Sequence, residues 1–159
     1  MTLNDVDTVT TFERWYAEEY RRLLAAVTLV TDDRGLATDA VDEAFSRALA
    51  DWARVGQMRQ PTGWTYRVAV NHVRRRTRRR LMEHRWTRSQ PSAGPVWDRD
   101  SDPDLWAAVR GLPSRQREAV ILRFVVDLPE ADIASMMRIT RGAVSASATP
   151  SCRGPRRDI

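Results

Sequence analysis

Arginine supplies all the permanent positive charge on the side chains of this sequence of 159 residues, which contains no lysine. Six arginines are concentrated in one short segment, at Arg74, Arg75, Arg76, Arg78, Arg79 and Arg80. The guanidinium group stays charged at cellular pH, and its planar set of donors matches phosphate oxygens and guanine edges. The segment therefore favours contact with nucleic acid, and a solvated basic surface or tail is the simpler alternative.

One face of the helix predicted for this segment combines guanidinium groups with an amide. Helical spacing of i, i+4, i+7 and i+11 places on this face Arg67, Asn71, Arg74 and Arg78. Tyr66, Val70 and Val73 occupy a different, apolar face. Arginine can neutralise phosphates and asparagine can pair with a base edge, so the first face is a candidate for DNA binding. The spacing alone leaves open that Asn71 is an ordinary surface amide.

Two tryptophans, Trp52 and Trp64, flank the predicted loop that precedes this helix. Aromatic side chains at such positions can stack on unpaired bases, as they do in single-strand binding sites. Burial in the core is the alternative, because the tryptophans of a small helical protein mainly supply apolar contact area.

The sequence does not support an enzyme. It has no glycine-rich phosphate loop, and no serine or cysteine is placed with a plausible histidine base. His72, His84 and Cys152 do not form a credible set of metal ligands. The paired carboxylates are explained more simply by helix capping or solvation. We therefore expect no catalytic residue, no metal and no cofactor.

The composition describes a globular protein with a polyanionic partner. Its net charge is +5, with 42% hydrophobic and 30% charged residues. No segment approaches the ~20 consecutive apolar residues of a membrane-spanning helix. Asp5 and Asp7 lie where a signal peptide would be basic. We therefore expect a cytoplasmic protein without membrane insertion.

Hydrophobic periodicity predicts an all-α protein, with a first helical domain over residues 1–86. A capping box of Thr10 and Glu13 predicts a first helix that runs to about Val30. A second helix is predicted from the apolar stripe Val41, Phe45, Ala48, Leu49 and Trp52. A loop over residues 52–60 then leads to a third helix, which runs from Thr62 into the arginine segment.

A second small helical domain is predicted over residues 104–149, after a proline-rich flexible linker over 87–103. Pro129 starts a helix that runs through Met137, and Thr140 caps another, which is the helix-turn-helix pattern. The residues expected to pack this pair together are Ile133, Ala134, Met137, Ile139 and Val144. Pro150 truncates the recognition helix at about Thr149 and leaves an irregular tail over 150–159, which a frameshift or truncation of the gene would explain.

Three segments in this order resemble the extracytoplasmic function (ECF) sigma factors of the sigma-70 family, with regions 2 and 4. They are DAVDEAFSRALADW (39–52), PTGWTYRVAVNHVRRRTRRR (61–80) and LPSRQREAVILRFVVDLPEADIASMMRITRGAV (112–144). The resemblance covers about residues 11–147. It implies a sigma factor that directs bacterial RNA polymerase to promoters and assists promoter melting. A free-standing helix-turn-helix transcriptional regulator is the alternative.

The resemblance also implies partners and residue roles. Binding of the minus-ten DNA falls to Trp64, Arg67, Asn71, Arg74, Arg75 and Arg78. Binding of the minus-thirty-five DNA falls to Arg141, Ser145 and Ser147. Binding of the β′ clamp helices of core RNA polymerase falls to Asp39, Asp42, Glu43 and Arg47, while the second domain contacts the β flap. An anti-sigma factor is a further partner that family members often have. Arg75 departs from the family, which often has Asp at this position.

Overall fold

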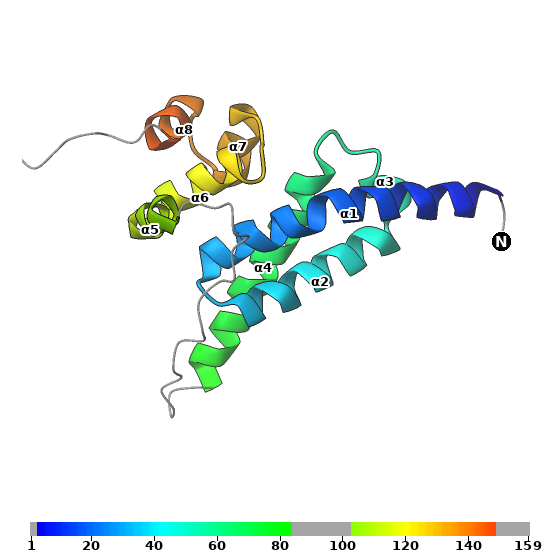
Figure 1. Cartoon of the computed structure of the whole chain (residues 1–159), viewed down its shortest axis with the longest axis horizontal. Coiled ribbons are helices and arrows are strands. Elements are labelled where there is room, and N and C mark those ends of the chain that lie inside the picture. Colours follow the sequence, from blue (N-terminus) through cyan, green and yellow to red (C-terminus); the bar gives the residue numbers. More distant parts are fainter. Residues whose placement is uncertain (1–2, 84–102, 149–159) are drawn as a thin grey trace, which may run out of the picture.

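The computed structural model describes residues 3–83 and 103–148, and all regular secondary structure in these ranges is α-helical. The first group of helices consists of α1 (Leu3–Thr31), α2 (Arg34–Ala50), α3 (Trp52–Val55) and α4 (Pro61–Glu83) (Figure 1). The second group consists of α5 (Pro103–Gly111), α6 (Ser114–Phe124), α7 (Glu130–Met137) and α8 (Arg141–Ala148). The all-α fold class is confirmed.

The first domain is built around the mutual packing of α1, α2 and α4. Each helix contributes large side chains that are almost fully buried, among them Leu23, Val41 and Tyr66. Helix α2 also packs through small residues: Ala37 and Ala40 are completely buried and allow the helices to approach closely. Aromatic rings close one end of this core, and Trp52 lies among them with Phe12 and Trp15.

Three local predictions for the first domain are wrong. Helix α1 begins at Leu3, so Thr10 lies within the helix and does not cap it. The predicted loop over residues 52–60 contains the short helix α3. Leu49 is 48% exposed although it was placed in the buried stripe of α2, whereas its neighbour Ala48 in the same stripe is completely buried.

Helix α2 begins at Arg34, before the predicted apolar stripe, which starts at Val41. Its start is set by Asp33, whose carboxylate accepts a hydrogen bond of 2.9 Å from the backbone N–H of Leu36. A side chain that caps a helix in this way pairs one of the otherwise unsatisfied amides of the first turn. With this cap, α2 starts about two turns before Val41, so that Asp39 lies well inside the helix.

The second domain contains the predicted helix-turn-helix pair, α7 and α8. Ile133, Ala134 and Val144 are buried between these helices and α6, as expected. Arg138 ends α7 in the left-handed conformation with φ of 54°, and the hydroxyl of Thr140 accepts a 3.3 Å hydrogen bond from the Ala143 amide. The predicted linker over 87–103 lies outside the described residues apart from Pro103, and so does the tail over 150–159.

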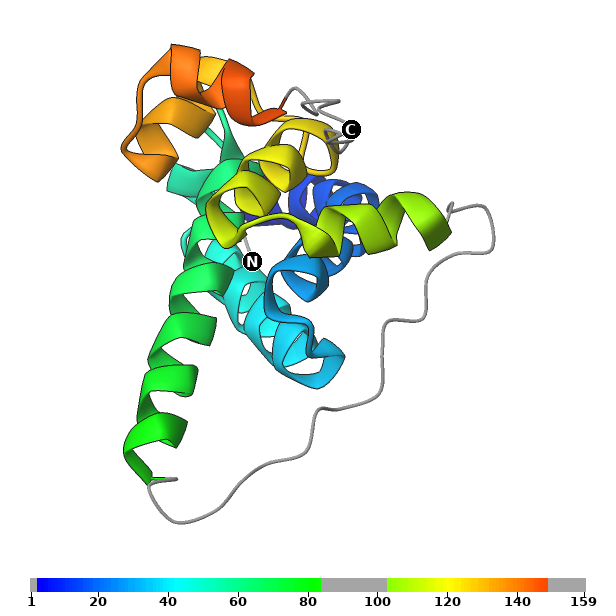
Figure 2. The ribbon, with the colours of Figure 1, turned by 90° about the vertical axis from the view of Figure 1, so that its left-hand side faces the viewer.

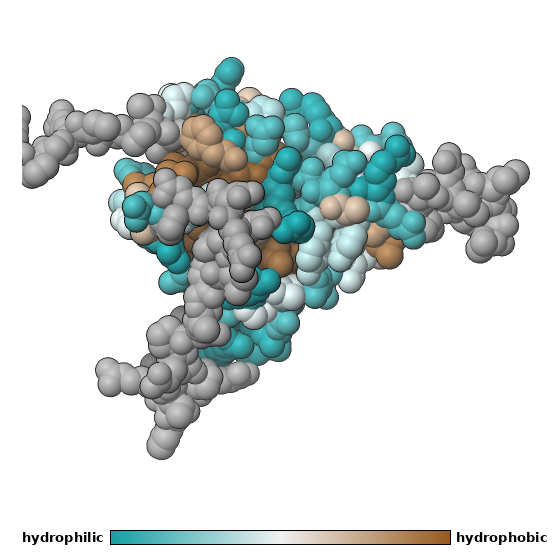
Figure 3. Space-filling view, viewed as in Figure 1, coloured by the Kyte–Doolittle hydropathy of each residue, from teal (hydrophilic) through white to brown (hydrophobic). Residues whose placement is uncertain are grey.

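The two groups of helices pack directly against each other. Helix α6 contacts α1, and the second domain lies beside the first half of α4, whose last turns extend away from the packed helices (Figure 2). Gly63 on α4 is buried beneath Leu128, and an ion pair joins Arg59 to Asp132. On the face in Figure 3, the surface over α1 and α2 is largely hydrophilic, while hydrophobic residues gather near α5 and α6.

Candidate nucleic-acid and polymerase interfaces

Helix α4 has a buried side and a basic side, as its sequence predicts. Tyr66, Val70 and Val73 are 1%, 4% and 9% exposed. The arginines of the other side are all exposed. Since burial of the apolar side fixes the rotation of α4, the arginines and Asn71 are held on its outer surface by packing.

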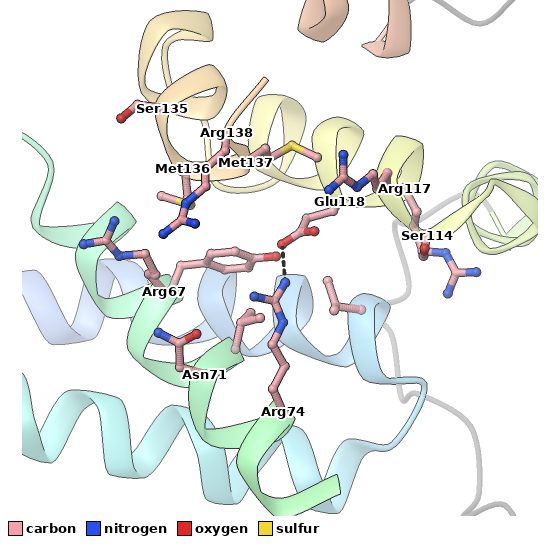
Figure 4. A pocket seen from close by; sticks show the side chains of 14 residues that line it. Arg67, Asn71, Arg74, Ser114, Arg117, Glu118, Ser135, Met136, Met137 and Arg138 are labelled. Atoms are coloured by element: carbon pink, nitrogen blue, oxygen red, sulfur yellow. Dashed lines mark ion pairs between the residues drawn. The ribbon is translucent and has the colours of Figure 1, made fainter. Parts of the chain in front are cut away.

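Arg67, Asn71 and Arg74 are brought together on one wall of a cavity of about 940 Å³ (Figure 4). We call this space, which lies between α4 and the second domain, the interdomain cavity. The second domain supplies the opposite wall, which includes Glu118 and Arg138. Arg78 does not line the cavity, although this residue shares the predicted helical face.

The charges that line the interdomain cavity are mainly positive. The lining contains five arginines, Arg67, Arg74, Arg115, Arg117 and Arg138, and a single carboxylate, Glu118. A terminal nitrogen of Arg74 lies 3.5 Å from Glu118 Oε1, so one of these guanidinium groups is paired. The remaining excess of positive charge suits a polyanion.

Tyr66 lines the same cavity and is fully buried. Burial, with a smaller contribution from the nearby Glu118 carboxylate, raises the pKa of the Tyr66 phenol above its ordinary value. Its hydroxyl has no hydrogen-bond partner among the described residues. Because a buried, unpaired hydroxyl costs free energy, the Tyr66 hydroxyl lowers the net stability of the packing around it.

Arg75 lies apart from the other predicted minus-ten residues. It lines a second groove of about 640 Å³ on another side of α4, together with Arg47, His72, Arg76, Arg79 and Arg80. Arg76 in this groove pairs with Asp39 of α2 at 3.3 Å. Helix α4 therefore presents two basic surfaces, and the predicted set of minus-ten residues is divided between them.

The two candidate stacking residues differ in their environment. Trp52 is 9% exposed and packs in the aromatic end of the core, which agrees with the alternative that it is structural. Trp64 is partly buried, and the guanidinium carbon of Arg54 lies 5.7 Å from its ring centroid. Of the two, Trp64 alone retains appreciable accessible ring area.

The predicted polymerase-binding residues lie along the outer surface of α2, and each has an intramolecular partner. Glu43 accepts a 2.7 Å hydrogen bond from the Nε of Arg47, one turn away. The Tyr20 hydroxyl donates a 2.8 Å hydrogen bond to Asp42. Burial first, and then Asp42, raises the pKa of Tyr20 to about 12. These contacts hold the acidic side chains in position while leaving them accessible.

The predicted minus-thirty-five residues lie on α8. Arg141 begins this helix and is exposed, as is Ser145. The Ser145 hydroxyl lies 3.2 Å from Glu130 Oε2 and 3.3 Å from the Arg141 carbonyl oxygen. Ser147 lies in α8, but its side chain is outside the described residues. Helix α8 ends at Ala148, close to the predicted end at Thr149.

Two further properties bear on the class of protein. In the described ranges, no helix is long and apolar enough to cross a membrane. The same residues contain no cluster of histidine, cysteine and acidic side chains that could hold a metal ion.

Three residues at the contact between the two groups of helices were not predicted as functional from the sequence: Glu118 and Arg138, which line the cavity, and Gly63, which lies against Leu128 and Met136. Glu118 lies on the polar side of an amphipathic helix, where a carboxylate is expected for solvation alone, so nothing in the sequence indicated its partner. The one local signal was Gly63, because a glycine within a helix often has a packing reason.

Comparison with known proteins identifies the second domain and the fold. Residues 103–148 match the protein family described as Sigma-70, region 4. The crystal structure of the sigma factor RpoE with the anti-sigma factor NepR from Bartonella quintana is similar, with a TM-score of 0.69 and 19% identity. The match covers 86% of this chain and 89% of RpoE. No curated protein matches the sequence.

The second domain is therefore a region 4 helix-turn-helix domain within a two-domain sigma-factor fold. Residues 103–148 thus carry the region 4 match, and the described chain as a whole has the fold of a solved sigma factor. Sigma factors are in general not enzymes. The structural match covers 86% of the chain and so extends beyond the region 4 match to the first group of helices.

Proposed function

We propose that this chain is an ECF sigma factor of the sigma-70 family that acts in the cytoplasm, recruits core RNA polymerase to promoters and helps to separate the DNA strands at the minus-ten element. The observation that carries the proposal is the arrangement of Arg67, Asn71 and Arg74 on one outer surface of α4. The protein itself makes and breaks no covalent bond in this scheme, and polymerase supplies the catalysis.

Strand separation at the minus-ten element is proposed to depend on binding free energy alone. Arg67 and Arg74 neutralise phosphates, and Asn71 pairs with the edge of an unpaired base. Trp64 offers a partly exposed ring on which a base can stack, at ~1 to 3 kcal/mol per base. Capture of unpaired bases then offsets the cost of unstacking the duplex. Arg75 and Arg78 lie outside the interdomain cavity and are proposed to add contacts with the phosphate backbone.

The outer surface of α2 is proposed to bind the β′ clamp helices of polymerase. Asp39, Asp42, Glu43 and Arg47 form an accessible row of charges there. Their existing partners keep the side chains ordered, which reduces the entropy lost when polymerase binds. A charged surface of this kind contributes to association rate and specificity more than to raw affinity.

The second domain is proposed to contact the minus-thirty-five element and the β flap. Arg141 and Ser145 are exposed on α8, and Ser147 follows them on the same short helix. Because α8 has only 8 residues, we propose that its DNA contacts are few and that the minus-ten contacts dominate promoter choice.

An anti-sigma factor is proposed as a further partner. The similar RpoE was crystallised in complex with the anti-sigma factor NepR. A comparable protein would bind this chain and keep it from polymerase.

Transcription in vitro with core enzyme and a promoter library tests the proposed function. We expect initiation from a sequence-restricted subset of promoters only when the sigma factor is present. Comigration of the protein with core enzyme on a sizing column supports recruitment independently. Elution of the protein alone, together with sequence-independent initiation, contradicts the proposal.

A further inference from the structure

The second basic surface of α4 forms a groove of about 640 Å³, which we call the arginine groove. One residue of α2 and five residues of α4 line it: Arg47, His72, Arg75, Arg76, Arg79 and Arg80. None of the described residues that line it is acidic, and its volume is in the range of sites that take small molecules. We propose that the arginine groove binds a compact polyphosphate, meaning a chain of linked phosphate groups such as a nucleoside triphosphate or inorganic tripolyphosphate.

Helix packing holds the cations of the arginine groove together. The five α4 residues recur at three- and four-residue spacing from His72 to Arg80, so they share one face of the helix. This face adjoins the buried side of α4, which includes Val73. The packing of α2 against α4 therefore fixes the direction of the face, and it brings Arg47 to the same groove.

Most of the guanidinium groups in the arginine groove have no countercharge. Arg76 pairs with Asp39 at 3.3 Å, and Arg47 pairs with Glu43 at 2.7 Å. Three other guanidinium groups form no ion pair with any described residue: Arg75, Arg79 and Arg80. The groove thus keeps an excess of positive charge, which suits a ligand with several negative charges close together.

A solvated basic surface is the simpler alternative, and the spacing of the charges argues against it. Arg75 and Arg79 are four residues apart, and like charges at this spacing destabilise a helix. The outer surface of α2 has the stabilising arrangement instead, with Glu43 four residues before Arg47. The helix dipole favours arginine in the last turn, but this accounts only for Arg80. A polyanion in the groove relieves the repulsion between the arginines, which favours binding.

The side chains of the arginine groove also suit phosphate by type. A guanidinium group presents planar pairs of donors that bind phosphate oxygens in a bidentate manner. Arg75 and Arg79 lie one turn apart, so they can hold successive phosphates of one ligand. His72 Nε2 has no hydrogen-bond partner among the described residues. No hydrogen bond through this atom fixes the ring, which can turn to donate to a phosphate oxygen.

The DNA backbone is a second source of phosphate, and Arg75 is already proposed to contact it. The presence of Arg47 favours the compact ligand, because cations from two helices surround one groove instead of forming a single outer ridge. The inference does not rest on the proposed function, since its test needs neither polymerase nor a promoter.

The test is isothermal titration calorimetry of the full chain with inorganic tripolyphosphate at about 0.15 M ionic strength, where weak surface attraction is screened. The groove variant is Arg75→Gln with Arg79→Gln. The lysine variant, Arg75→Lys with Arg79→Lys, keeps the charge and removes the planar donors. The control, Arg14→Gln with Arg22→Gln, removes two exposed arginines of α1 that lie outside the groove. Circular dichroism verifies folding.

We expect wild type to bind one tripolyphosphate and the groove variant to bind it at least about tenfold more weakly. The lysine variant should lose less affinity, because only the bidentate geometry is removed, and the control should stay within about twofold of wild type. If the groove variant fails to fold, the lysine variant is compared with the control instead.

Three results of the titration overturn the inference. The first is no binding of tripolyphosphate by wild type. The second is unchanged affinity in the groove variant, which means that the anion is held elsewhere. The third is an equal loss in the groove variant and the control, which means that only net charge matters.

Fluorescence anisotropy with a short labelled DNA duplex separates the two sources of phosphate. We expect the groove variant to lose less affinity for the duplex than for tripolyphosphate. A larger loss for the duplex assigns the arginine groove to the DNA backbone and overturns the inference, while the proposed backbone contact of Arg75 then stands.

Discussion

The indole rings of Trp15 and Trp52 lie with their centroids 4.7 Å apart at an interplanar angle of 31°, which ties α1 to the short helix α3. Phe12 meets the Trp52 ring edge-on at 5.2 Å. The Trp52 indole N–H donates a 3.2 Å hydrogen bond to Thr11. Trp52 is thus a structural residue at the point where the chain turns from α2 toward α4.

Trp52→Ala is expected to lower the free energy of unfolding by about 3 to 5 kcal/mol, because it leaves a cavity in the aromatic end of the core. Urea denaturation followed by circular dichroism measures the change. Trp64→Ala is the matched variant. Because the Trp64 ring is only partly buried, its removal should lower the free energy of unfolding by less. A Trp52→Ala protein with wild-type stability and impaired DNA binding would reverse the roles assigned to these two residues.

Asn71→Ala is expected to weaken promoter opening by about tenfold, through loss of a base-edge contact, while polymerase affinity stays near wild type. Permanganate reactivity of unpaired thymines measures opening, and sizing chromatography with core enzyme measures recruitment. Arg79→Ala is the control, because Arg79 lies in the other basic groove. Equal losses in both assays would show that Asn71 faces polymerase.

Glu43→Arg is expected to reduce affinity for core polymerase by at least about tenfold, because it reverses the charge in the middle of the α2 row and places it beside Arg47. Fluorescence titration with core enzyme gives the affinity. Glu13→Arg, at an exposed position of α1, makes the same change of charge elsewhere. Unchanged polymerase affinity in the Glu43 variant would remove Glu43 from the docking surface.

Ionisation of the Tyr20 phenol is expected to lower the free energy of unfolding at alkaline pH. Its folded-state pKa is raised from 10.0 to about 12, so above pH 10 the unfolded chain releases this proton before the folded protein does. The stabilisation is complete below pH 10 and is lost as the pH rises toward 12. Tyr20→Phe should weaken this pH dependence and remove one late step from the ultraviolet titration of phenolate. A titration that loses an ordinary tyrosine instead would mean that Tyr20 is not held by Asp42.

The buried and basic faces of α4 could be predicted because the helical repeat of its apolar residues defines both. Tyr66, Val70 and Val73 repeat at helical spacing, which fixes where Arg67 and Asn71 must point. The start of α2 was harder to predict, because two of the three buried residues in its first turns, Ala37 and Ala40, give a weak apolar signal and only Leu36 is large. Helix α1 likewise begins upstream of Thr10, so the capping pattern occurs inside the helix and does not mark its start.

The pairing of Arg74 with Glu118 could not be predicted, because it depends on how two domains pack and not on any local pattern. Helical spacing also did not separate Arg75 from Asn71. The two positions are four residues apart, and only the side on which α2 packs reveals that Arg75 faces a second groove. Tertiary packing therefore supplied what periodicity could not.

The most direct test of the central claim is permanganate footprinting of a promoter selected from the library, with core polymerase, in the presence and absence of this protein. We predict that thymines in the minus-ten element become reactive only when both proteins are present, and that Asn71→Ala removes most of this reactivity. Reactivity that core polymerase produces alone, or its complete absence with the wild-type protein bound to polymerase, would contradict the account.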